Sequence, residues 1–453
     1  MSLSNPMSDS ASFPQNALMK PKRLLLLTSK LGYQTRSFSE AARKLDVEIV
    51  FATDRCHQLD DPWNDRAIAV HFEEPEAAAF SILETLRGNE PDGVLALGDR
   101  SVITAAYVAR GLGIFHNHPA SVESCRSKEK MREAFRVSGL RTPAFRALPI
   151  VPTPDPALSG IKFPCVVKPL CLSASQGVMR ANNVVEFRRA VERLAHLLQS
   201  PELRASRDPD LDRMIVEDYI PGREVAVEGL ISEGVLRILA IFDKPDPLEG
   251  PYFEETIYVT SSRLPQEQQD AIARCSRDVA RALGLIHGPI HAEFRVNDEG
   301  VWPLDNVWPI EIAPRPIGGL CARALRFGPE LISLEELLVR HAMGLEGTDA
   351  EREAISSGVM MIPVPANGIL ERVEGEHEAR AVENIASLEI TARLHDKIVA
   401  WPEGSSYLGF IFARADDPEK VERALRAAHA KLNFVVRAEL PVGNAATGKL
   451  PMV

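Results

Sequence analysis

The sequence of 453 residues predicts an α/β fold that continues into α+β regions, and three patterns carry this prediction. Short apolar runs alternate with helical patterns up to about residue 115, which is typical of a parallel sheet with helices on both faces. Strand patterns then follow one another between residues 213 and 242, which favours antiparallel pairing. From about residue 358, short strand patterns mix with an amphipathic helix over residues 417–432, which indicates a separate α+β domain.

The first region begins with an apolar run after Pro21 and then alternates regularly. Each strand is predicted from a short apolar run bounded by turn residues, and each helix from apolar positions three and four residues apart. A glycine ends the third helix. The predicted elements are a strand at 23–29, a helix at 37–45, a strand at 47–54, a helix at 77–88, a strand at 92–98 and a helix at 101–113.

The middle region opens with one predicted helix over residues 121–139, which Gly139 and a proline-containing link close. Residues 200–212 are polar and are predicted to form a linker or mobile loop. The other predicted elements are strands at 163–170 and 178–183, a helix at 184–199, strands at 213–220, 223–232 and 235–242, a helix at 266–285, strands at 288–296 and 307–313, and a helix at 331–345.

Composition excludes several classes of protein. The formal net charge of −11 argues against a nucleic-acid partner bound through a basic surface, although a small anionic ligand remains compatible with it. Six scattered cysteines without C-x-x-C spacing indicate reduced thiols. No apolar run approaches the roughly 18 residues of a membrane span, and polar residues 1–20 indicate a disordered tail instead of a signal peptide. We therefore expect a cytoplasmic protein without a membrane partner.

Lys168 ends a predicted strand and precedes a loop of small residues that runs to Gly177. A lysine beside such a loop can hold phosphate oxygens, because its charge adds to backbone N–H groups that point at the ligand. The alternative, that Lys168 is a solvated lysine followed by an ordinary loop, is equally open. Further along, Glu217 to Glu224 pass through a Pro-Gly turn, which would suit an adenine edge and a ribose, but which also fits a surface hairpin.

Glu293 and Glu311 are placed on adjacent antiparallel strands, each between apolar residues. Two such carboxylates are costly to bury unless something neutralises them. A divalent cation such as Mg²⁺ would do so, whereas the alternative is pairing with Arg295, Arg315 or Arg323. The glycines that follow Arg315 indicate a backbone shaped for close approach of a ligand, which favours the metal. His287 and His291 are four residues apart, but Gly288 and Pro289 between them argue against a helical metal pair.

Taken in order, these motifs resemble those of the ATP-grasp enzymes over residues 22–345, and most of all the L-amino acid (dipeptide) ligases. The stretches "EIAPRPIGG", "YFEETIYVTSSRLP" and "GVMMIPVPANGILERVEG" carry the second likeness. The resemblance implies an ATP-grasp fold in three parts: an N-terminal α/β domain at 21–120, a two-lobed nucleotide clamp at 121–346 and a C-terminal α+β domain at 347–453, after the tail at 1–20.

The same resemblance implies roles for individual residues, with ATP and Mg²⁺ as cofactors. Nucleotide contacts would come from Lys128, Lys168, the loop residues Ser173, Ser175 and Gly177, the hinge residues Glu217, Tyr219 and Ile220, and Glu224 at the ribose. Glu293 and Glu311 would bind the metal. Arg315 and Gly318 would hold the reacting carboxylate, and Glu255 would belong to the substrate loop.

The expected activity is ATP-dependent ligation of a small-molecule carboxylate and an amine through an acylphosphate, with an amino acid as a substrate and a homodimer as the expected assembly. The chain departs from the family pattern at Ala313, where an asparagine is common, and at Tyr258, where dipeptide ligases tend to have a histidine. Two alternatives stay open at this point. One is a carboxylase or purine-pathway type of ATP-grasp enzyme, and the other is a nucleotide-binding protein that has lost catalysis.

Overall fold

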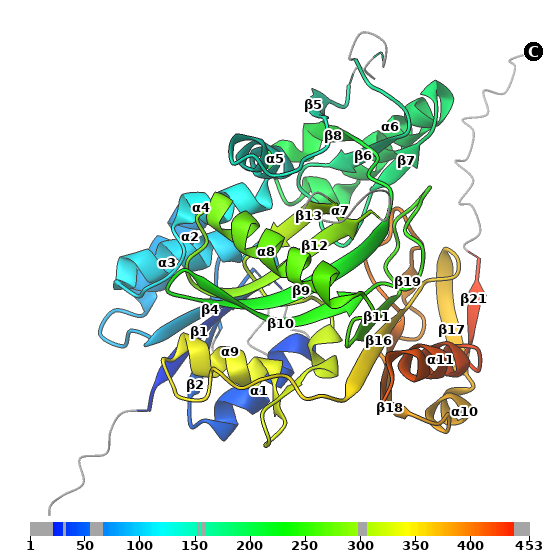
Figure 1. The fold of residues 1–453 in the computed structure, drawn as a ribbon. Coiled ribbons are helices and arrows are strands. Elements are labelled where there is room, and N and C mark those ends of the chain that lie inside the picture. The colour runs from blue at the N-terminus through cyan, green and yellow to red at the C-terminus, as the bar shows by residue number, and fades with distance from the viewer. Residues whose placement is uncertain are drawn as a thin grey trace, which may run out of the picture.

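The computed structural model describes residues 21–29, 33–54, 67–151, 155, 160–297 and 306–438, and Figure 1 shows how their elements are arranged. A large central sheet lies between an N-terminal α/β layer and a small upper lobe, and C-terminal strands extend it (Figure 1). The tail predicted for residues 1–20 lies outside the described residues. Within the described ranges, no helix combines the length and apolar character needed to cross a membrane.

The N-terminal layer is a parallel sheet in the order β3-β2-β1-β4, as the alternating pattern predicts. All six residues of β1 are buried because helices cover both faces of the sheet, which is characteristic of parallel sheets. The elements are β1 Arg23–Thr28, α1 Tyr33–Lys44, β2 Glu48–Thr53, β3 Ile68–Ala69, α2 Pro75–Thr85, β4 Gly93–Leu97 and α3 Val102–Leu112. Asp99 follows β4 at the carboxyl end of this sheet, where ligands bind in many α/β folds.

The single helix predicted over residues 121–139 is wrong: two helices, α4 Pro119–Arg126 and α5 Lys128–Val137, occupy this stretch. Ser127 between them is extended, and its hydroxyl accepts a hydrogen bond from the backbone N–H of Lys130 at 3.4 Å. Serine competes with the helical backbone in this way and favours a cap. Lys128 therefore begins a helix instead of lying within one.

The small upper lobe is an antiparallel sheet in the order β5-β8-β6-β7, with α6 packed on it (Figure 1). Strand β8 lies in this sheet and not beside β9 and β10, although the three follow one another along the chain. Residues 200–212 contain two short helices, so the predicted linker has local structure. The elements are β5 Phe145–Pro149, β6 Cys165–Pro169, β7 Met179–Ala181, α6 Val184–Leu198, α7 Pro201–Arg204, a 3-10 helix Pro209–Asp212 and β8 Arg213–Asp218.

The central sheet has eight strands in the order β13-β12-β9-β10-β11-β16-β20-β18, and every pair is antiparallel. Pro309 fits in β13 because this strand is at the edge, where a missing N–H breaks no ladder. The central elements are β9 Arg223–Ser232, β10 Val235–Asp243, β11 Ile257–Thr260, α8 Gln266–Ala282, β12 Gly288–Val296, β13 Val307–Ala313, a 3-10 helix Cys321–Ala324, β14 Arg326–Phe327, β15 Ile332–Ser333 and α9 Leu334–Ala342.

The C-terminal strands continue this central sheet across the domain boundary predicted at residues 346 and 347. Strands β16, β20 and β18 extend it, and a separate sheet in the order β19-β17-β21 lies beside them. The elements are β16 Ser356–Ile362, β17 Gly368–Glu374, α10 Glu376–Arg380, β18 Ile385–Ile390, β19 Lys397–Ile398, β20 Gly409–Ala415, α11 Pro418–His429 and β21 Asn433–Arg437. The mixture of helices and strands predicted for this region is confirmed, and the domain boundaries stay a prediction.

Candidate active site

One cavity of about 590 Å³ is lined by residues of the N-terminal layer, the small lobe, the central sheet and the C-terminal strands. It gathers side chains that are widely separated in the sequence, which is what a binding site between layers requires. Among the residues predicted from the sequence, it is lined by Lys128, Lys168, Ser173, Ser175, Glu217, Tyr219, Ile220, Glu224, Glu255, Glu293, Glu311, Arg315 and Gly318. Their individual roles stay predictions, but the structure brings them together.

Gly177 is the predicted site residue that does not line the cavity. Its φ of +73° is strained for other residues, and a Cβ here would lie 2.9 Å from a methyl group of Leu194. Its backbone N–H donates to the carbonyl oxygen of Pro402 at 2.8 Å, and the Gln176 side-chain amide donates to the carbonyl oxygen of Glu403 at 2.6 Å. Gly177 thus shapes the loop and joins it to the C-terminal domain.

Glu217 lies between two cations in the small lobe. Its carboxylate accepts hydrogen bonds from Arg132 Nε at 2.7 Å and from Lys168 Nζ at 2.6 Å. Burial alone would raise the pKa of Glu217, but the two cations lower it to about 2. Burial also lowers the pKa of Lys168. The Glu217 side chain is therefore committed to this ion pair, while Lys168 faces the cavity with its remaining N–H donors.

Lys128 also lies beside the loop of small residues that follows Lys168, and its ammonium donates to the carbonyl oxygen of Leu172 at 2.6 Å. This hydrogen bond places the Lys128 charge beside Ser173, at the start of the small-residue loop. Two lysines and the loop thus border one part of the cavity, a combination that suits phosphate oxygens.

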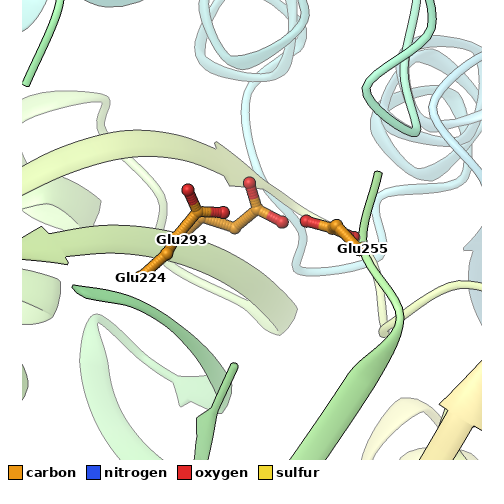
Figure 2. A group of neighbouring side chains, drawn as sticks. All are labelled: Glu224, Glu255 and Glu293. Carbon is orange, nitrogen blue, oxygen red and sulfur yellow. The ribbon is translucent and has the colours of Figure 1, made fainter. Parts of the chain in front are cut away.

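Three glutamates converge at the centre of the cavity (Figure 2). Glu224 on β9 and Glu293 on β12 rise from neighbouring strands, and Glu255 points toward them from the segment before β11. One oxygen atom from each carboxylate lies within 4.8 Å of the others. Carboxylate oxygens at this spacing are donors that Mg²⁺ accepts, so the residues present fit a divalent cation.

Lys244, which the sequence patterns did not single out, neutralises this cluster. Its ammonium is 2.8 Å from Glu224 and 3.0 Å from Glu293, and it also donates to Glu255. Burial would lower the pKa of Lys244, but the three carboxylates raise it well above its usual value. Burial and the neighbouring Glu293 raise the pKa of Glu255 to about 7. Lys244 follows β10 directly, so an acid–lysine pair at the end of a strand was the available signal.

Glu293 and Glu311 are direct cross-strand partners in the β12–β13 register, as predicted. In the part of the chain that the structure describes, none of the three arginines forms a hydrogen bond or an ion pair with either carboxylate, although Arg315 is near enough to Glu311 for the charge of Glu311 to help raise the pKa of Arg315. Arg295 hydrogen-bonds Glu224 at 3.2 Å, Arg315 pairs with Asp99, and Arg323 pairs with Glu389. Among the described residues, no hydrogen bond or ion pair occupies the Glu311 carboxylate, which is half-buried at the cavity wall.

Arg315 is held by Asp99 of the N-terminal layer, through hydrogen bonds of 2.8 Å from Nε and 3.0 Å from Nη2. Such a two-point pair fixes the plane of the guanidinium. Burial would raise the pKa of Asp99, but Arg315 lowers it. Asp99 was not predicted as a site residue, although an acid just after a buried parallel strand is a recognisable signal.

Tyr258 and the C-terminal domain complete the wall. The Tyr258 hydroxyl donates to Glu255 at 2.7 Å, and its ring lies 5.1 Å from the Lys244 ammonium. Tyr407 and Phe410 line the cavity from the loop before β20 and from β20 itself. No local pattern could assign these two aromatic residues to a site, because they meet it only through the continuous central sheet.

Comparisons with known proteins identify two domains in this chain and a solved structure with a similar fold. Residues 161–324 match the ATP-grasp domain, and residues 360–437 match the L-amino acid ligase C-terminal domain 2. The crystal structure of an L-amino acid ligase from Bacillus licheniformis superposes with a TM-score of 0.76 and 26% identity, covering 92% of this chain and 100% of that one. The fold and the site therefore place the chain among the ATP-grasp ligases, which form carbon–nitrogen bonds with ATP.

Within that class, the matched C-terminal domain and the superposed structure put this chain close to the L-amino acid ligases. Alanine–anticapsin ligase of Bacillus subtilis is 23% identical over 241 residues, which is 50% of each chain. An uncharacterized protein, y4rH of Sinorhizobium fredii, is 24% identical over 450 residues, covering 95% of this chain and 87% of its own.

Proposed function

We propose that this chain is a carboxylate–amine ligase that activates the carboxylate with ATP as an acylphosphate and takes an amino acid as a substrate. The observation that supports it most is the single cavity shared by the ATP-grasp lobes, the Arg315–Gly318 loop and the matched C-terminal domain. A cavity that reaches from Lys128 and Lys168 to the partly buried Arg315 would take ATP and a second substrate end to end.

ATP would lie with its base against the hinge residues Tyr219 and Ile220, since the Glu217 carboxylate is occupied by Arg132 and Lys168. Backbone groups of the hinge would therefore recognise the adenine edge. Glu224 would meet the ribose, and Lys128 and Lys168 the phosphates. Mg²⁺, held by Glu293 and Glu311, would neutralise negative charge on the phosphate oxygens.

In the first step, a carboxylate oxygen of one substrate attacks the γ-phosphorus, the bond to the β-phosphate oxygen breaks, and ADP leaves. In the second step, the amine nitrogen attacks the acyl carbon, phosphate leaves, and the nitrogen loses one proton. Arg315 would stabilise negative charge on the reacting carboxyl group in both steps, because Asp99 holds its guanidinium ready at the cavity wall. Positioning and charge are the protein's main contributions to such phosphoryl transfer.

An amino acid is supported as a substrate by the matched C-terminal domain, which is a part of L-amino acid ligases. This domain supplies Tyr407 and Phe410 to the cavity, so it would contact the substrate that lies beyond the phosphates. Alanine–anticapsin ligase, by its name, joins an amino acid to a second molecule, and the partial match to it points the same way.

A phosphate-release screen tests the proposal, using ATP, Mg²⁺ and pairs of amino acids, with mass spectrometry of the products. The expected result is phosphate release only when both amino acids of a pair are present. The product should have the summed mass of the two amino acids minus the mass of one water. ATP hydrolysis that depends on bicarbonate alone would replace the proposal with a carboxylase, and tight ATP binding without any phosphate release would replace it with a binding protein. Light scattering on the same sample tests the predicted homodimer.

A further inference from the structure

A buried glutamate and a buried histidine on neighbouring strands form a pair that none of the predicted roles includes. Glu228 on β9 and His291 on β12 are direct cross-strand partners, and Glu228 Oε1 lies 2.5 Å from His291 Nδ1. Their exposed fractions are 1% and 8%. A carboxylate can only accept a hydrogen bond, so the Nδ1 atom must carry the proton that it donates. This bond fixes the plane and the orientation of the imidazole.

The second oxygen of Glu228 connects this pair to the loop that carries Arg315. Glu228 Oε2 accepts a hydrogen bond from the backbone N–H of Ile317 at 3.2 Å. Ile317 lies between Arg315 and Gly318, the two residues expected at the reacting carboxylate. Both oxygens of one buried carboxylate are therefore in use, one toward β12 and the other toward the loop.

The second ring nitrogen of His291, Nε2, points toward the expected metal ligand Glu293. His291 Nε2 lies 3.7 Å from Glu293 Oε1, and His291 lines the cavity. The strand register places Ala313 opposite His291. Because alanine has no polar side-chain atoms, it offers the imidazole no competing partner, and the Nε2 atom is left to face Glu293.

We propose that Glu228 and His291 are positioning residues that fix the Glu293 carboxylate and the Arg315–Gly318 loop relative to one another. The inference rests on the proposed function, since it concerns the residues expected to hold the metal and the reacting carboxyl group. One carboxylate thereby sets the spacing between the place where ATP is bound and the place where the acyl group reacts. Groups that orient ligands from behind commonly contribute about 10–100-fold to metal affinity or activity.

Two substitutions test the hydrogen bonds of Glu228 and the contact between His291 and Glu293. Glu228→Gln keeps the size of the side chain but leaves one acceptor for two N–H donors, so it loosens both connections. His291→Asn keeps a donor near the position of Nδ1 and removes the Nε2 atom that faces Glu293. Glu336→Gln is the matched control, because Glu336 is a buried carboxylate that pairs with Arg340 at 2.9 Å and does not line the cavity.

Turnover and nucleotide binding are measured on the full chain, with the amino-acid pair found in the phosphate-release screen and with the non-hydrolysable analogue AMP-PNP. We expect Glu228→Gln to lower kcat at saturating Mg²⁺ by about 10–100-fold, with less than a threefold change in KM for ATP. Both Glu228→Gln and His291→Asn should raise the Mg²⁺ concentration needed for AMP-PNP binding by about tenfold. Glu336→Gln should change none of these values.

Wild-type kcat and wild-type Mg²⁺ dependence in folded Glu228→Gln would overturn the inference, as would equal losses in Glu336→Gln. If the Glu228→Gln variant does not fold, the inference is tested by the Mg²⁺ concentration that the His291→Asn variant needs for AMP-PNP binding. A wild-type chain without turnover would refute the proposed function, and the AMP-PNP measurement would still decide whether the pair positions Glu293. Circular dichroism melts of every variant separate loss of fold from loss of position.

Discussion

Replacing Glu217 with glutamine should destabilise the small lobe strongly at neutral pH and little in acid. The change leaves the charges of Arg132 and Lys168 buried without their shared partner. The pKa of Glu217 falls from 4.5 to about 2, and each unit corresponds to about 1.4 kcal/mol, so the ionised carboxylate contributes about 3 kcal/mol. Removing one partner of a buried ion pair typically lowers the free energy of unfolding by about 3–5 kcal/mol, which agrees with the contribution of about 3 kcal/mol for Glu217. For a chain of 453 residues that unfolds as one unit, a fall in the unfolding temperature of about 3 °C would follow.

The sign of the pH dependence follows from the lowered pKa. The contribution is fully present above the unfolded pKa of 4.5, and it is lost as the pH falls toward about 2. Thermal unfolding of wild type and Glu217→Gln between pH 7 and pH 3 measures the difference. Glu133→Gln, which breaks an exposed pair with Arg136, is the control and should change stability by less than about 1 kcal/mol. A difference between wild type and Glu217→Gln that stays constant down to pH 3 would refute the reasoning.

Four further substitutions test the cavity. Asp99→Asn loosens the Arg315 guanidinium and should lower kcat about tenfold with little change in the melting temperature, as steady-state kinetics would show. Lys244→Met leaves the three converging glutamates without their cation. Added Mg²⁺ should therefore raise the melting temperature more in this variant than in wild type. An equal rise in both proteins would contradict the role of Lys244 in neutralising the glutamates. Glu311→Gln and Arg315→Ala should each abolish amine-dependent ADP release in a folded protein, and near wild-type turnover in either would remove that residue from the site.

The main elements of the fold could be predicted because each has a local cause. Strand β1 is an apolar run bounded by turn residues, and α6 has an apolar face at helical spacing with Asn183 as its N-cap. The break at Ser127 was missed because serine is compatible with a helix interior and with a cap. The continuation of the central sheet into β16 could not be predicted, since strand pairing over long distances leaves no local pattern.

The residues of the candidate site also fall into those that could be predicted from the sequence and those that could not. Glu293 and Glu311 were found because a carboxylate on an apolar strand is costly without a partner, and the motif order then located the nucleotide residues. Lys244 and Asp99 each follow a strand, but this local signal does not show which side chain they pair with, and Glu228 is explained only by its partners in space. Asp99 and Arg315, for example, are 216 residues apart in the sequence.

The continuous central sheet has a mechanical consequence for how substrates enter. Strands β12 and β13, which carry Glu293 and Glu311, and strands β16 and β20 of the C-terminal domain belong to one hydrogen-bonded sheet, so these two parts cannot swing apart as independent bodies. Opening would instead require the small lobe to tilt away from that sheet. Its loop is fastened to the C-terminal domain by the hydrogen bonds of Gly177 and Gln176 to Pro402 and Glu403, so these contacts would be among those that break and re-form as the lobe opens and closes.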